Sequence, residues 1–131
     1  MATLNGEFTV TSWDESTYAE GEGERKLTRA SVTQDVTGDV VGTGRVEWLM
    51  SYGEDGTAHF VGLQQFEGTI DGREGGAVLE TIGDFDGTEA TWTAKVIPGS
   101  GTGGWAGIEG EGRFQAPHGS KASFTLDCTL G

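Results

Sequence analysis

The chain has 131 residues, 24 of them glycine and two proline, and its 21 acidic against eight basic side chains give a formal net charge of −13. A surface this acidic repels the phosphates of nucleic acids and anionic lipid headgroups, so neither nucleic acid nor a membrane is expected as a partner. The length suits one domain with its own core, predicted over residues 1–131.

Cys128 is the single cysteine, so no disulfide can form within the chain. The first residues lack the basic and apolar regions of a secretion signal, and no run approaches the roughly 18 apolar residues of a membrane helix. We therefore expect a cytoplasmic protein. Cys128 lies in an alternating apolar pattern, which predicts a buried thiol without a chemical role.

Alternation of apolar and polar residues predicts strands along the whole chain, and no window has a helical period. The first strand is expected from Phe8 to about Trp13, and the second over residues 28–36, after a loop rich in Glu and Gly. Asp-Gly pairs at 55–56, 71–72 and 86–87 predict tight hairpin turns between the strands that follow, because this pair readily adopts positive φ. Clear strands flank these turns at 46–52, 58–66 and 89–96.

Residues 98–114, PGSGTGGWAGIEGEGRF, contain a G-x-G-x-x-G match at Gly99, Gly101 and Gly104. A dinucleotide site would need a helix to follow, and none is predicted. The run is instead expected to make a turn and then a strand from Trp105 to Phe114. A last alternating strand covers 122–130.

About eight strands, several of them long, are thus joined mostly as a meander. Without helices to cover them, such strands favour closure into a barrel, because closure removes exposed edges. The predicted fold is all-β: a single eight-stranded antiparallel β-barrel.

Two stretches carry a family resemblance: GTAHFVGLQQFEGTIDGREGGAVLETIGDFDG at 56–87 and KVIPGSGTGGWAGIEGEGRF at 95–114. They resemble the bacterial family called domain of unknown function 3224, and the likeness runs from Phe8 to Asp127. The resemblance implies an allene oxide cyclase-like, calycin-like barrel. Named enzymes of that fold steer ring closures in an apolar lumen, and related barrels are often homo-oligomers. The glycine run at 99–112 is then part of the architecture.

Polar residues interrupt the apolar faces at Gln34, Gln64 and Tyr52. Buried amides need hydrogen-bond partners, so Gln34 and Gln64 either hold strands in register or face a ligand. Trp48 and Trp92 lie on clean apolar faces, where they either fill the core or line a lumen for a conjugated ligand.

Glu80 is the first candidate for an acid or base, because Val78 and Ile82 flank it on its own face. A dry face would raise the pKa of Glu80 toward neutrality, whereas an external face would leave a surface charge or an ion pair. Glu67 is a weaker candidate of the same kind.

Other catalytic signatures are missing from the sequence. His59 and His118 are far apart, no ligand spacing predicts a metal, no nucleophile elbow is present, and no cofactor is expected.

Two functions remain. The first is a small-molecule-binding barrel that acts as a cofactor-independent isomerase or cyclase on an apolar or conjugated substrate. The alternative is a non-catalytic binding or carrier barrel for a small apolar metabolite.

Overall fold

The computed structural model describes residues 2–117 and 122–130, which form strands and turns without a helix. No helix able to cross a membrane occurs among these residues. The strands are β1 (Ala2–Glu20), β2 (Lys26–Gly38), β3 (Val40–Tyr52), β4 (Ala58–Ile70), β5 (Arg73–Phe85), β6 (Glu89–Val96), β7 (Thr102–Gly103), β8 (Glu109–Pro117) and β9 (Ala122–Thr129).

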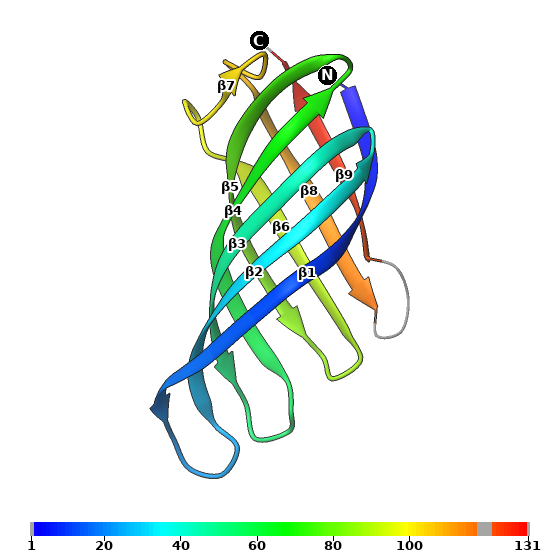
Figure 1. The fold of residues 1–131 in the computed structure, drawn as a ribbon. Helices are drawn as coiled ribbons and strands as arrows, with labels where there is room; N and C mark the ends of the chain where they lie inside the picture. The colour runs from blue at the N-terminus through cyan, green and yellow to red at the C-terminus, as the bar shows by residue number, and fades with distance from the viewer. Residues whose placement is uncertain (1, 118–121, 131) are drawn as a thin grey trace.

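Eight strands form a closed antiparallel barrel in the order β1-β2-β3-β4-β5-β6-β8-β9, and β9 pairs with β1 to complete it (Figure 1). The two-residue strand β7 lies outside this circuit and pairs only with β5. The predicted eight-stranded barrel with mostly meander connections is confirmed. Closure leaves no long unpaired edge among the eight strands.

The hairpin predicted at Asp71-Gly72 joins β4 to β5, with Ile70 paired to Arg73. Asp71 has φ of 49° and Gly72 has φ of 76°. Positive φ at both central residues is what a type I′ turn requires, and its twist matches the flanking strands. The other two Asp-Gly pairs also lie in turns, between β3 and β4 and between β5 and β6.

Aromatic side chains fill the middle of the barrel. Trp92 stacks on Phe114 with ring centroids 5.2 Å apart, and Phe114 stacks on Phe124 at 5.0 Å. The buried rings are Phe8, Trp48, Phe60, Phe66, Trp92, Phe114 and Phe124, together with Trp105. An eight-stranded barrel is just wide enough to be filled in this way.

The connection between β6 and β8, residues 97–108, corrects one prediction. The strand expected from Trp105 begins only at Glu109, because successive turns bond the amide of Trp105 to Thr102 O and the amide of Ile108 to Trp105 O. Trp105 and Ile108 are instead buried as part of the core.

Trp105 is held by its indole Nε1, which donates to the carbonyl oxygen of Arg73 at 2.9 Å. A Cβ at Gly75 would lie 2.8 Å from the indole ring, so glycine there makes room for it. The glycine-rich segment thus forms a loop at the barrel end that holds both termini (Figure 1).

At the opposite end, the hairpin of β1 and β2 reaches furthest, followed by the hairpin of β3 and β4 (Figure 1). β1 has 19 residues and continues to Glu20, well beyond the predicted end near Trp13. Its pairing with β2 shifts between Val10 and Ser12, so Thr11 is an extra residue in β1. Such a β-bulge reverses which later residues face inward.

Candidate functional site

A cavity of about 270 Å³ opens at the end of the barrel where the hairpin of β1 and β2 reaches furthest, and we call it the cup. Its lining is almost entirely apolar and comes from seven of the eight barrel strands: Phe8, Val10, Trp13, Gln34, Trp48, Met50, Tyr52, Phe60, Phe85, Ala90, Trp92 and Ala116. Four of the five residues predicted to bind a ligand line it: Gln34, Trp48, Tyr52 and Trp92. The fifth, Gln64, is fully buried beside the cup and contacts it through hydrogen bonds.

Trp48 is the centre of the aromatic wall. Its ring centroid lies 5.1 Å from those of Phe60 and Trp92 and 5.9 Å from that of Trp13. Its Nε1 donates to Thr81 Oγ1 at 3.2 Å, and that hydroxyl donates to the carbonyl of Gly62 at 3.0 Å. The indole is therefore satisfied and fixed in orientation before any ligand enters.

A short chain of hydrogen bonds crosses the interior beside the cup. Trp92 Nε1 donates to Gln64 Oε1 at 3.4 Å, and Gln64 Nε2 donates to Gln34 Oε1 at 3.1 Å. Gln34 Nε2 has no hydrogen-bond partner within the described ranges, although Gln34 is only 1% exposed. The internal hydrogen-bond partner expected for the glutamines is thus observed, and one amide group of Gln34 is left without a partner among the described residues.

Gly44 makes space for the Gln34 amide. The two residues face each other across β2 and β3, and a Cβ at Gly44 would lie 2.7 Å from Gln34 Oε1. A larger residue would push the amide out of its hydrogen bond with Gln64. The absence of a side chain at Gly44 of β3 therefore leaves room for the amide of Gln34 on β2.

Glu15 forms a polar cluster at the rim of the cup. Its Oε2 accepts from Tyr52 Oη at 2.6 Å and from Thr28 Oγ1 at 2.7 Å, and its Oε1 accepts from Trp13 Nε1 at 3.0 Å. Burial alone would raise the pKa of Glu15, but these three hydrogen bonds and the charge of Lys26 outweigh burial and lower it.

The hydrogen bond between Glu15 and Tyr52 lowers the pKa of Glu15 but raises that of Tyr52. Burial first, and then the hydrogen bond and negative charge of Glu15, raise the pKa of Tyr52 well above its ordinary value. At neutral pH the rim therefore holds a carboxylate and a protonated phenol.

Sequence reasoning missed Glu15 and Trp13 as site residues. Trp13 pairs with Val32 and Glu15 with Ala30, both inward-facing residues of β2, only because the bulge at Thr11 shifts the register. Strict alternation from Phe8 would have placed both on the outer face. An inserted residue leaves no mark in the apolar pattern, so no sequence signal identifies it here.

Glu80 and Glu67 lie on the outer face and are exposed. Glu80 stands opposite Lys95 of β6, and Glu67 accepts from Gln65 Nε2 at 3.4 Å. The dry face on which their acid–base roles depended is absent at both positions. The external alternative for Glu80 is the one observed, because odd-numbered residues of β5 face inward and Glu80 is even.

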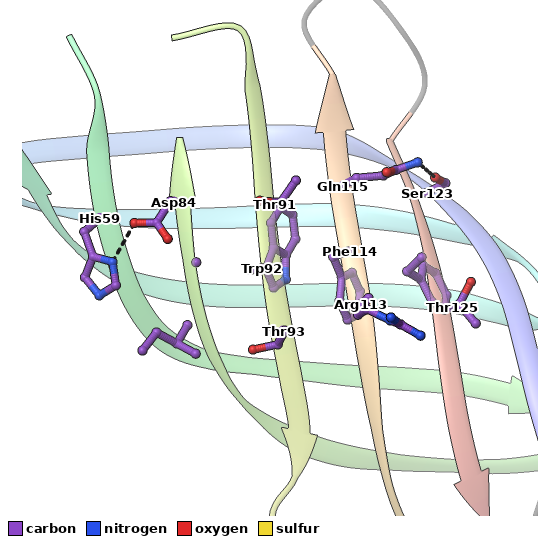
Figure 2. A pocket seen from close by; sticks show the side chains of 13 residues that line it. His59, Asp84, Thr91, Trp92, Thr93, Arg113, Phe114, Gln115, Ser123 and Thr125 are labelled. Atoms are coloured by element: carbon purple, nitrogen blue, oxygen red, sulfur yellow. Dashed lines mark hydrogen bonds and ion pairs between the residues drawn. The ribbon is translucent and has the colours of Figure 1, made fainter. Parts of the chain in front are cut away.

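A larger groove lies on the outer surface across β4, β5, β6, β8 and β9 (Figure 2). His59 and Asp84 are hydrogen-bonded there, with Nδ1 and Oδ1 2.7 Å apart. Thr91, Thr93 and Arg113 also line it. This groove is more polar and more open to water than the cup, so the cup is the better ligand site.

His59 and Cys128 lie on different strands, β4 and β9. Cys128 is buried as predicted, and burial raises the pKa of its thiol. His118 lies outside the described residues. Across residues 2–117 and 122–130, no three His, Cys, Asp or Glu side chains gather in a group that could hold a metal ion.

Comparison with known proteins agrees with the barrel. A crystal structure of a protein with unknown function from the DUF3224 family of Shewanella oneidensis MR-1 superposes with a TM-score of 0.84. It is 24% identical, and the match covers 100% of this chain and 98% of that one, which supports the fold alone. None of the curated proteins matches the chain. The pattern of the family described as "Protein of unknown function (DUF3224)" matches residues 4–128, and the chain therefore belongs to the DUF3224 family.

Proposed function

We propose that this protein binds one small, largely apolar molecule in the cup and does not transform it. The observation that carries the proposal is the cup itself: a recess of about 270 Å³ walled by aromatic rings at the open end of a barrel whose middle is filled. Ligand pockets start at roughly 300 Å³, so a compact molecule of up to about three rings suits it.

Binding without chemistry is favoured by the ionisable groups around the cup. Glu15 is a carboxylate already engaged by three donors, and Tyr52 keeps its proton because its pKa is raised. A general base needs a pKa near the working pH and room to reach the substrate. The isomerase or cyclase hypothesis loses its acid–base candidates, because Glu80 and Glu67 lie on the outer face.

The test is a titration with the neutral fluorescent probe N-phenyl-1-naphthylamine. We expect saturable binding at one site, with energy transfer from the tryptophans of the cup to the probe. Ala116→Leu, which fills the cup, should weaken binding by about tenfold, because added side-chain volume displaces ligand contacts.

Ala106→Leu is the matched control, since Ala106 is exposed in the loop at the other end of the barrel. It should leave probe binding unchanged. Absence of saturable binding by the parent protein would contradict the proposal, as would equal affinity in Ala116→Leu.

A further inference from the structure

The cup contains one polar feature that an apolar ligand would leave unused, the side-chain amide of Gln34. We propose that the ligand carries a neutral carbonyl oxygen, which accepts a hydrogen bond from Gln34 Nε2. This inference rests on the proposed function and adds the chemical class of the ligand.

The direction of the hydrogen bonds makes Gln34 Nε2 a donor. The indole N–H of Trp92 can only donate, so the atom of Gln64 that faces it must be the oxygen. The NH₂ group of Gln64 therefore donates to Gln34, which accepts this hydrogen bond with its side-chain oxygen. The amide nitrogen of Gln34 is left at the end of the chain, and the indole of Trp92 fixes this assignment.

A buried donor without an acceptor is costly, and such groups in native proteins usually meet water or a ligand. Gln34 belongs to the lining of the cup, and its amide nitrogen has no acceptor among the described residues. The nitrogen itself is covered, so a ligand oxygen would supply the acceptor once the side chain of Gln34 turns its amide toward the cup. The rest of the lining is apolar, so the rest of the ligand is expected to be hydrocarbon.

The charges around the cup select a neutral acceptor over an anionic one. Glu15 is held as a carboxylate at the rim, and the whole chain carries a formal net charge of −13. An anionic ligand would meet repulsion at the entrance and would find only an uncharged amide inside. A ketone or aldehyde fits the amide without this penalty.

The experiment compares two probes of nearly the same shape, 2-acetylnaphthalene and 2-isopropylnaphthalene, of which only the first has an acceptor. Each is measured by displacement of N-phenyl-1-naphthylamine from the parent protein and from Gln34→Met. Water favours the ketone more than the hydrocarbon, so the informative quantity is the ratio of the two dissociation constants. We expect Gln34→Met to shift that ratio against the ketone by about tenfold, the usual effect of one buried hydrogen bond.

Gln65→Met is the matched control, because Gln65 is the neighbour of Gln64 that faces outward and is exposed. It should leave the ratio unchanged. Gln34→Met removes one unpaired donor and frees another on Gln64, so we expect its urea midpoint to stay close to that of the parent protein.

A second readout needs no variant to fold. In a ¹H–¹⁵N correlation spectrum of the parent protein, the side-chain NH₂ signals of Gln34 should move on addition of the ketone and stay in place with the hydrocarbon. An unchanged ratio in Gln34→Met, or no ketone-specific shift, overturns the carbonyl assignment while leaving apolar binding intact. Failure of both probes to bind overturns the proposed function as well.

Discussion

Glu15 connects three other side chains at the open end of the barrel. Its carboxylate joins Trp13 of the same strand to Thr28 of β2 and Tyr52 of β3. Three donors keep this carboxylate charged, while burial and the contact with Glu15 raise the pKa of Tyr52 and keep its phenol protonated. The rim is therefore fixed in place by hydrogen bonds, while the wall below it is held by ring contacts.

At this scale we predict that Glu15→Gln lowers the free energy of unfolding at neutral pH by about 0.5 kcal/mol, a modest loss because the carboxylate is partly exposed. The pKa of Glu15 is lowered in the folded protein, so its contribution is complete above its ordinary value of 4.5. The contribution is lost as the pH falls through the lowered pKa. Urea unfolding of both proteins across this range should show the difference shrinking in acid, and a constant difference would contradict the assigned cause.

Strand β1 determines which residues reach the cup. Before the extra residue at Thr11, Phe8 and Val10 face the interior, and after it Trp13 and Glu15 do so. The bulge adds one residue to β1, and this places the indole of Trp13 and the carboxylate of Glu15 on the inner face. Both residues are an odd number of positions from Phe8, so regular alternation would place them on the outer face. Both side chains belong to the long part of β1 that continues to Glu20.

Deletion of Thr11 should remove the bulge and keep Trp13 and Glu15 on the inner face, because Ser12 and Trp13 then follow Val10 in regular alternation opposite Thr33 and Val32. We expect the probe to bind within about twofold of the parent affinity, since the cup keeps its aromatic wall and its rim. The measurement is the same titration, with far-UV circular dichroism to verify that the barrel persists. Trp13→Ala is the reference, because it removes an indole from the cup, and it should weaken probe binding by about tenfold. An equal loss on deletion of Thr11 would contradict the predicted register.

The whole molecule carries a large excess of negative charge over its closed barrel. The ion pairs of arginine among the described residues are Arg25–Glu54 and Arg29–Glu47. With a formal net charge of −13, repulsion between like charges outweighs these few exposed pairs.

We therefore predict that salt stabilises the protein. Raising NaCl from about 0.05 M to about 0.5 M shortens the screening length from more than 10 Å to a few ångströms. The free energy of unfolding should rise by roughly 1 kcal/mol, equivalent to about 4 °C in Tm. Thermal unfolding followed by tryptophan fluorescence measures this directly, and a Tm that falls with NaCl would show that attractive pairs dominate.

The sequence by itself determined the strands, the three Asp-Gly turns and most inward faces, because period-two alternation and turn chemistry are local properties. It identified Gln34, Trp48, Tyr52 and Trp92, four residues that line the cup. It could not place Glu15, whose inward position depends on an inserted residue in β1.

Only the tertiary structure decided which faces meet. Closure of β9 onto β1 made the interior, and the register between β2, β3 and β4 brought Gln34 to Gln64. Glu67 of β4 and Glu80 of β5 lie in water on the outer face, whereas their apolar neighbours in the sequence had left a dry face open as an alternative. Burial is a property of paired strands, so one strand read alone cannot say on which side of the barrel its side chains lie.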